Sequence, residues 1–298
     1  MERIVNVGLI QMSCGDDTEE NYNKAVAYIE QAARQGADIV CTQELFKSRY
    51  FCQVVDSHLF SLAERVTADS STIQGLCELA ADLEIVIITG LFEKRASGLY
   101  HNTAILIDAD GSYLGKYRKM HIPNDPLYYE KFYFTPGDLG YPVFKTQYAD
   151  VGVLICWDQW FPEAARLLAM MGAEVILIPT AIGNRRRAGE QSTTDGYDET
   201  WITVQRGHAV ANACYLAAVN RVGFEPETGN EDGIEFWGQS FVADPYGRVV
   251  AKAAADGEEI VVTPIDLGEV HRMRSSWSYP FRDRRVDSYD GLVRLYLD

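Results

Sequence analysis

Several features that mark other classes of protein are missing from this sequence of 298 residues. No apolar run approaches the roughly 20 residues that a membrane-spanning helix needs. Residues 1–7 lack the basic region, apolar core and small-residue cleavage site of a secretory signal. The net charge is −16, whereas a surface for nucleic acid needs a basic surplus. These absences predict a cytoplasmic protein that binds neither membrane nor nucleic acid.

Cysteine and histidine are sparse and scattered. The six cysteines form no Cys-x-x-Cys pair, and the five histidines form neither a His-Glu-x-x-His motif nor a close pair. Scattered cysteines in a chain of this length indicate reduced thiols. The histidine spacing also offers no dedicated metal site. We therefore expect neither a disulfide framework nor a resident metal.

The most informative stretch surrounds Cys156. Residues 151–155 form an apolar run that predicts a buried strand, and Pro162 with Glu163 is typical of a helix start. Cys156 thus lies where a strand ends, and in open α/β sheets ligands gather at the carboxyl ends of strands. A buried, inert thiol is the commoner fate of cysteine. Partners elsewhere in the chain must therefore decide whether Cys156 is a nucleophile.

Strands and helices alternate along the chain. The apolar patterns predict strands over 4–10, 37–41, 85–88, 151–155, 174–178, 215–219 and 259–262, helices over 21–33, 70–80, 164–171 and 201–213, hairpins around 109–112 and 244–247, and loops over 121–139 and 181–200. Alternating strands and helices predict the α/β class, and the hairpins predict mixed sheets. The two halves have a similar order of elements. We expect one domain over 1–298, with two mixed sheets packed face to face and helices outside.

A cysteine nucleophile needs a base that forms the thiolate and donors for the oxyanion. Glu44 follows a buried strand and precedes apolar residues, so it would be partly desolvated, as suits a general base. Lys119 follows the first hairpin and offers a fixed positive charge. Glu130 lies in an aromatic run. Singly, each fits an ordinary role equally well, as a solvated glutamate, a surface lysine or half of a loop salt bridge.

Together, these residues resemble the nitrilase superfamily of carbon–nitrogen hydrolases. The resemblance spans roughly residues 5–266 and rests on three motifs in this order: Gln43-Glu44-Leu45-Phe46, Tyr117-Arg118-Lys119-Met120-His121-Ile122-Pro123 and Cys156-Trp157-Asp158. It implies a four-layer α-β-β-α sandwich with a catalytic triad of Glu44, Lys119 and Cys156. It also implies that Glu130 orients the site, that the N–H of Trp157 helps to bind the oxyanion, and that no cofactor is needed. Members usually form dimers or larger assemblies, so we expect a homo-oligomer with the tail 272–298 in a subunit contact.

Within the superfamily, the chain looks most like the members that hydrolyse N-carbamoylputrescine. The similar stretches are 132–138, 156–166 and 279–285. Relatives that hydrolyse N-carbamoyl amino acids carry arginines just after the nucleophile, where this chain has Gln159 and Trp160. The resemblance therefore implies a small cationic carbamoyl-amine as substrate.

The resemblance also implies which residues would contact that substrate. An acid that holds the distal ammonium is expected after 181–183, where arginines stand at 185–187. These arginines would point outward, and an acid further along the loop would serve. The expected substrate-binding residues are His121, Trp157, Gln159, Trp160, Glu190 and Asp195.

Three alternatives stay open. The first is another amidase or ureidopropionase of the same superfamily, acting on a small carbamoyl or amide substrate. The second is a papain-type hydrolase in which His121 or His208 is the base, although the missing secretory signal disfavours it. The third is a non-catalytic binding or scaffold protein, which the joint presence of Glu44, Lys119 and Cys156 disfavours.

Overall fold

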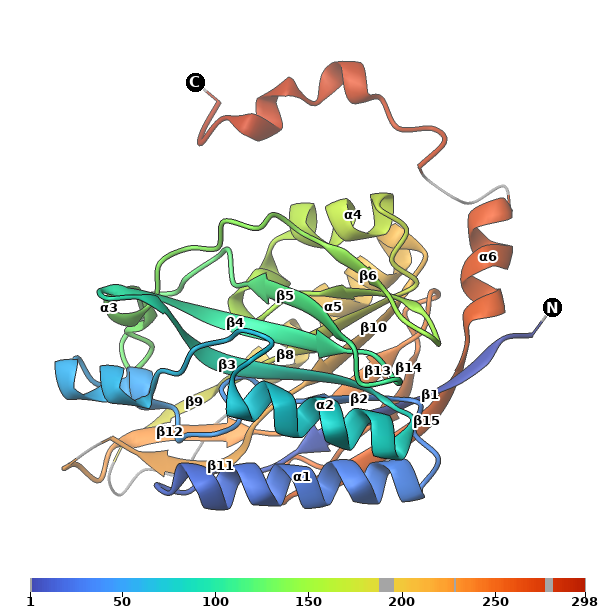
Figure 1. The fold of residues 1–298 in the computed structure, drawn as a ribbon. Coiled ribbons are helices and arrows are strands. Elements are labelled where there is room, and N and C mark those ends of the chain that lie inside the picture. Colours follow the sequence, from blue (N-terminus) through green and yellow to red (C-terminus); the bar gives the residue numbers. More distant parts are fainter. Residues whose placement is uncertain (1, 188–195, 228, 277–280, 298) are drawn as a thin grey trace.

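The computed structural model describes residues 2–187, 196–227, 229–276 and 281–297 (Figure 1). Its centre is a pair of six-stranded mixed sheets. The first sheet has the order β15-β1-β2-β3-β4-β5. Its strands are β1 (Ile4–Gln11), β2 (Ile39–Thr42), β3 (Val86–Ala96), β4 (Leu99–Ile107), β5 (Tyr113–Arg118) and β15 (Glu259–Asp266). The neighbours β1, β2 and β3 form parallel pairs, whereas β15, β4 and β5 join the sheet through antiparallel pairs.

The second sheet has the order β14-β13-β10-β8-β7-β6, with a parallel centre of β10, β8 and β7. Its strands are β6 (Val143–Lys145), β7 (Asp150–Val153), β8 (Val175–Pro179), β10 (Tyr215–Val219), β13 (Phe241–Ala243) and β14 (Val249–Lys252). A smaller antiparallel sheet, ordered β11-β12-β9, adjoins this body. Its strands are β9 (Gly183–Arg186), β11 (Val222–Pro226) and β12 (Gly233–Trp237).

Helices cover the outer faces of the two large sheets. The helices α1 (Thr18–Arg34) and α2 (Ser71–Leu83) pack on the first sheet, and α4 (Pro162–Met170) and α5 (Tyr197–Asn212) pack on the second. The described residues also contain the short α3 (Glu130–Tyr133) and α6 (Leu267–Ser275). This arrangement confirms the predicted α-β-β-α sandwich.

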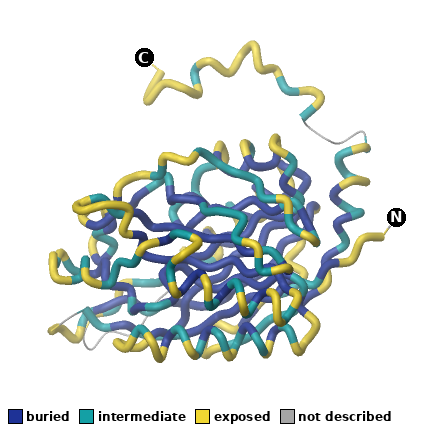
Figure 2. The backbone as a smooth tube through the Cα atoms, viewed as in Figure 1, coloured by how far each residue is buried: buried dark blue, intermediate teal, exposed yellow. Residues whose placement is uncertain are grey.

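The alternation of side chains along β1 explains the four layers. Val7 and Leu9 belong to the apolar cluster between the two sheets, whereas Ile10 belongs to the cluster under α1 and α2. Successive side chains of a strand point to opposite faces, so a strand that is apolar throughout must be covered on both sides. Figure 2 shows these buried strands at the centre of the molecule.

Two predicted loops contain regular structure. The segment 181–200 contributes β9, and α5 begins at Tyr197, earlier than predicted. The segment 121–139 contains α3. β9 forms because it pairs with β12, which lies about 50 residues later in the chain, and such a distant partner leaves no local pattern. In the described residues, no helix has the length and apolar character of a transmembrane span.

Candidate active site

Cys156 lies just beyond the carboxyl end of β7, as the apolar pattern predicts. It begins the 3-10 helix η3 (Cys156–Trp160), and its side chain is buried. Its φ is +43°, in the left-handed region that non-glycine residues rarely adopt. The Sγ atom lies 3.7 Å from the carbonyl oxygen of Ala181. Ala181 comes directly after Thr180, which follows the end of β8. Such strained positions persist where the surrounding structure fixes them, and they cluster at functional sites.

Asp158 is the residue that fixes this turn. Its Oδ2 accepts hydrogen bonds from the N–H of Ile155 at 3.0 Å and the hydroxyl of Tyr117 at 2.7 Å. Its Oδ1 accepts the backbone N–H of His121 at 3.0 Å. Asp158 therefore ties the chain on both sides of Cys156 to the end of β5.

Lys119 joins two carboxylates that come from distant parts of the chain. Its Nζ atom lies 2.7 Å from Oε1 of Glu44 and 2.6 Å from Oε2 of Glu130. Glu44 follows β2, Lys119 follows β5 and Glu130 begins α3. All three side chains have an exposed fraction of 0%. A charged group is buried only when it is paired, and here one lysine serves both acids.

Two neutral side chains fix the carboxylates. The hydroxyl of Tyr50 donates to Oε1 of Glu130 at 2.6 Å, and Nδ2 of Asn102 donates to Oε1 of Glu44 at 2.6 Å. Oε2 of Glu44 is buried and has no hydrogen-bond partner among the described residues. One oxygen of Glu44 is thus held, and the other is available to accept a proton.

Arg221 holds the backbone that carries Glu44. Its fully buried guanidinium donates to the carbonyl oxygens of Glu44 and Leu45, both at 3.0 Å, and of Ser48 at 2.9 Å. Its charge is balanced by Glu225 at 2.7 Å. Leu45 has a φ of +52°, so this turn also needs external support. The sequence analysis did not identify Arg221, although a charged residue between two apolar strands is a signal of a buried pair.

The electrostatics of the site keep Cys156 protonated at rest. Burial raises the pKa of Cys156 well above its usual value, Glu44 raises it further, and the nearby Lys119 opposes both. Burial alone would lower the pKa of Lys119, but Glu130 and Glu44 outweigh it and raise that pKa well above its usual value. Burial raises the pKa of Glu130 to about 7 although Lys119 opposes this. The thiol therefore needs a base to become a nucleophile.

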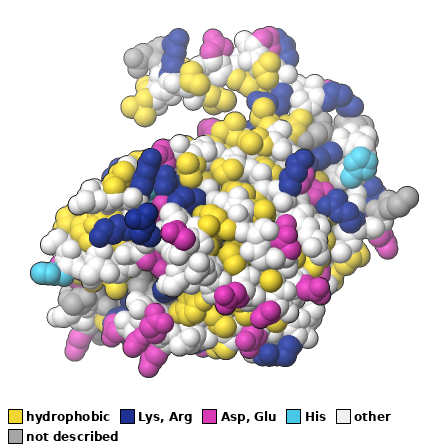
Figure 3. All heavy atoms as spheres, in the orientation of Figure 1, with side chains coloured by type: hydrophobic (Ala, Val, Ile, Leu, Met, Phe, Trp, Pro, Cys, Tyr) yellow, Lys and Arg dark blue, Asp and Glu magenta, His cyan; other side chains and the backbone are white. Residues whose placement is uncertain are grey.

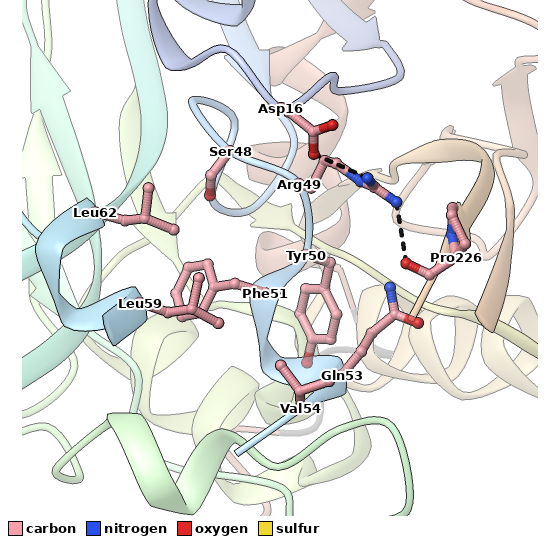
Figure 4. Close-up of a pocket in the computed structure, with 10 residues that line it drawn as sticks. All are labelled: Asp16, Ser48, Arg49, Tyr50, Phe51, Gln53, Val54, Leu59, Leu62 and Pro226. Atoms are coloured by element: carbon pink, nitrogen blue, oxygen red, sulfur yellow. Dashed lines mark hydrogen bonds and ion pairs between the residues drawn. The ribbon is translucent and has the colours of Figure 1, made fainter. Parts of the chain in front are cut away.

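The loop that carries Tyr50 is anchored from its outer side. A small cavity of about 150 Å³ lies beside this loop. Figure 4 shows the residues that line it, among them Tyr50. Beside it, Arg49 pairs with Asp16 at 2.8 Å and donates to the carbonyl oxygen of Pro226 at 3.0 Å. The backbone N–H of Tyr50 also donates to Glu225 at 2.6 Å. These contacts set the position of the tyrosine that binds Glu130.

A larger cavity of about 550 Å³ opens over Cys156. The lining includes Cys156, Trp157 and the segment after β8, together with charged and aromatic residues. The lining residues are Pro123, Asp125, Pro126, Tyr128, Cys156, Trp157, Ala181, Ile182, Gly183, Asn184, Arg185 and Tyr197. This volume suits a small linear molecule.

Comparison with known proteins agrees with this geometry. The sequence profile described as carbon-nitrogen hydrolase matches residues 6–275. The chain belongs to the carbon–nitrogen hydrolase family. It is 44% identical to the N-carbamoylputrescine amidase of Solanum tuberosum, over 98% of this chain and 96% of that protein. It is 41% identical to the citrullinase of Francisella tularensis, over 98% and 99%. A crystal structure of a carbon-nitrogen hydrolase from Helicobacter pylori G27 superposes with a TM-score of 0.92, at 40% identity, over 99% of this chain and 100% of that chain.

The position of Gln159 in this hydrolase corrects one expectation about the substrate. Gln159 is fully buried and does not line the cavity. Its Oε1 accepts the indole N–H of Trp201 at 2.7 Å, and its carbonyl oxygen bonds Nε2 of His208 at 2.8 Å. Gln159 thus connects η3 to α5. The sequence spacing could not reveal this, because it does not show which side of η3 faces α5.

His121 and Trp160, which were expected to bind substrate, are not among the residues that line the cavity. The ring of His121 stacks on Phe161 with centroids 3.7 Å apart, and its Nδ1 bonds Asp158 at 2.7 Å. His208 is bonded to Gln159, as described above. Both histidines that were candidates for the base are therefore hydrogen-bonded to residues other than Cys156. Trp160 packs against Trp157, with centroids 6.3 Å apart.

The arginines after Gly183, which were expected to point outward, have different surroundings, although Arg185 and Arg187 are both exposed. Arg185 lines the cavity, whereas Arg186 pairs with Glu235 at 2.7 Å. They lie on opposite faces because side chains alternate along β9. Glu190 and Asp195, the acids expected at the distal ammonium, lie outside the described residues.

The described part of the chain contains no group of three His, Cys, Asp or Glu side chains placed to hold a metal. All six cysteines are free thiols.

Proposed function

We propose that this carbon–nitrogen hydrolase removes the terminal carbamoyl group of a small linear ureido compound through a thioester at Cys156. The observation that carries the proposal is the buried Lys119 between Glu44 and Glu130, whose charges act on Cys156 at the base of the cavity. A base and a fixed cation beside a thiol are what acyl transfer to cysteine requires.

In the first half of the reaction, Oε2 of Glu44 takes the proton of Cys156. The thiolate then attacks the ureido carbon, and the oxyanion is stabilised by Lys119 and the N–H of Trp157. That N–H lies in the first turn of η3, where backbone N–H groups have no acceptor within the helix. When the tetrahedral species collapses, the bond to the terminal nitrogen breaks. Glu44 returns the proton to this nitrogen, and ammonia leaves.

In the second half, water replaces ammonia. Glu44 takes a proton from the water, whose oxygen attacks the carbamoyl-thioester carbon. The bond to sulfur breaks, and Glu44 returns the proton to Cys156. The released carbamate decomposes to carbon dioxide and the free amine. Glu130 touches neither reactant in this scheme, and it acts by holding Lys119.

N-carbamoylputrescine is the proposed reference substrate. This choice rests on the resemblance of the sequence to the superfamily members that hydrolyse this compound, and on the name of the amidase that is 44% identical. The citrullinase, at 41% identity, bears the name of a compound with the same ureido end. The test is ammonia release from ureido compounds, simple amides and nitriles. Turnover of amides or nitriles without turnover of any ureido compound would contradict the proposal.

The substitution Glu130→Gln tests whether Glu130 acts by positioning Lys119. The change preserves volume but removes the charge that holds Lys119, and a misplacement of about 1 Å can cost about a hundredfold in rate. We expect kcat to fall by about that factor, with little change in thermal stability. Because the pKa of Glu130 is about 7, wild-type kcat/KM should decline as the pH falls through 7, and this limb should shift in the variant. An unchanged kcat and an unchanged limb would leave Glu130 as a simple ion pair.

We also propose that the enzyme is a homo-oligomer joined by its C-terminal tail. Within this tail, the segment 281–297 extends away from the body in Figure 1, and Figure 3 shows hydrophobic side chains along it. Val293 is 90% and Tyr296 is 81% exposed. Apolar residues concentrated on a projecting segment are typical of an interaction surface.

Truncation after residue 285 should therefore lower the molar mass in solution. We expect light scattering coupled to gel filtration to show an oligomer for the full chain and a smaller species for the truncated one. The melting temperature serves as the control for folding of the body. An unchanged molar mass would contradict the proposed role of the tail.

A further inference from the structure

Arg185 and Asp125 both line the cavity over Cys156, and neither charged group has an ion pair with a described residue. The part of the cavity that these two residues line is called its mouth. Given the proposed ureido hydrolysis, on which this inference rests, we infer that the mouth binds the zwitterionic head of an α-amino acid. Arg185 would bind the carboxylate and Asp125 the ammonium. The preferred substrates are then ureido α-amino acids of the citrulline type, rather than ureido amines such as N-carbamoylputrescine.

Arg185 and Arg186 have different surroundings because their side chains lie on opposite faces of β9. Arg186 is neutralised by Glu235 and lies over the ring of Phe224 at 4.1 Å. The side chain of Arg185 lies on the opposite face of β9, the residue lines the cavity, and its guanidinium has no hydrogen bond or ion pair with any described residue. Arg185 offers five N–H donors in a planar fork that matches a carboxylate. The same charge repels an ammonium at this place.

Asp125 stands in the cavity wall at the start of a rigid turn. The N–H of Tyr128 donates to the carbonyl oxygen of Asp125 at 2.8 Å. Pro126 and Leu127, with a φ of +66° for Leu127, occupy the central positions, as in a type II turn. The carboxylate of Asp125 has no hydrogen-bond or ion partner in the part of the chain that the structure describes. It is therefore free to bind a cation.

Tyr128 connects the two charged residues. Its hydroxyl donates to the carbonyl oxygen of Gly183 and accepts the N–H of Gly183, both at 3.0 Å. The turn of Asp125 is thereby fastened to the first residue of β9, two residues before Arg185. Gly183 itself permits the tight pairing with β12, because a Cβ there would lie 2.2 Å from the carbonyl oxygen of Glu235. Both charges are thus held on one rigid frame, as recognition of a head group requires.

Four substrates of matched length test this inference. Citrulline carries both head groups, N-carbamoylputrescine only the ammonium, 5-ureidopentanoate only the carboxylate, and n-butylurea neither. Ammonia release from each gives kcat/KM for the same ureido end. One charge-assisted contact at a partly exposed site is worth about a factor of ten. We expect citrulline to exceed N-carbamoylputrescine by about tenfold or more, and n-butylurea to be the poorest.

Two variants assign the charges, and a third is the control. Arg185→Gln should lower kcat/KM by about tenfold for citrulline and 5-ureidopentanoate, without lowering it for N-carbamoylputrescine. Asp125→Asn should lower it for citrulline and N-carbamoylputrescine but not for 5-ureidopentanoate. Arg187→Gln removes the same charge from the same segment, but this residue does not line the cavity. It should change none of the four values appreciably.

The outcomes distinguish this inference from the proposed function. If N-carbamoylputrescine exceeds citrulline in the wild type, or if Arg185→Gln affects all four substrates equally, the inference is wrong while ureido hydrolysis stands. If none of the four compounds is hydrolysed, the proposed function fails and the inference fails with it. The substrate-specific pattern described above would support both.

Discussion

Replacement of Cys156 by serine should abolish turnover while the fold stays intact. Serine is almost isosteric with cysteine, and within the described residues the thiol makes a single long hydrogen bond, 3.7 Å to the carbonyl oxygen of Ala181. A hydroxyl is a far poorer nucleophile when its base is a carboxylate. We expect kcat to fall by about 10⁴-fold or more, in the range of removing an active-site nucleophile. Ammonia release and the melting temperature are the measurements.

Intact-protein mass spectrometry adds a direct observation of the intermediate. Wild-type enzyme quenched during turnover should carry one N-substituted carbamoyl group, with a mass increase equal to the substrate less ammonia, and Cys156→Ser should carry none. Cys77→Ser is the matched control, because Cys77 is a half-buried thiol of α2 outside the site. It should keep wild-type turnover. Activity of Cys156→Ser within tenfold of wild type, or an adduct on it, would exclude Cys156 as the nucleophile.

The fold was predictable because its determinants are local. Apolar strands such as β7 and β8 and the helix start at Pro162 are visible in short windows of sequence, and their alternation indicates the α/β class. β9 was missed because its residues are polar and its formation depends on pairing with β12. The start of α5 was misplaced for a similar reason, since its first turn is polar.

The reactive groups were also predictable, whereas most of their supports were not. Glu44 and Cys156 directly follow strand patterns, so their positions at sheet edges could be inferred. Arg221, by contrast, acts on Glu44 across 177 positions of the chain through backbone carbonyl oxygens. Tyr50 and Asn102 lie in segments whose spacing does not show what their side chains face. The side of η3 on which Gln159 lies is set by its packing against α5. This packing is visible only in the folded chain.

Lys119→Met should disable catalysis and also make stability depend on pH. Methionine keeps much of the volume but removes the cation that we propose to stabilise the oxyanion, and loss of such a donor costs about 10²–10³ in kcat. The effect should fall on kcat rather than on KM alone. The variant also leaves Glu44 and Glu130 buried without their counter-ion. Breaking a buried ion pair costs about 3–5 kcal/mol, unless one of the acids takes a proton.

The pH dependence has a definite sign. The pKa of Glu130 is already about 7 in the presence of Lys119, and removing the cation should raise it further. An acid with a raised pKa in the folded state binds more protons folded than unfolded, so stability falls as the pH rises above the unfolded value of 4.5. We therefore expect Lys119→Met to melt near the wild-type temperature at pH 5 and far below it at pH 8.

The double variant Lys119→Met/Glu130→Gln separates the two roles of the lysine. It removes one buried charge of each sign, so the melting temperature at pH 8 should recover towards that of the wild type. Turnover should stay as low as in Lys119→Met, because the oxyanion still lacks its cation. Recovery of activity together with stability would mean that Lys119 serves only to keep the carboxylates in place. Recovery of stability without recovery of activity would show that Lys119 takes part in the reaction itself.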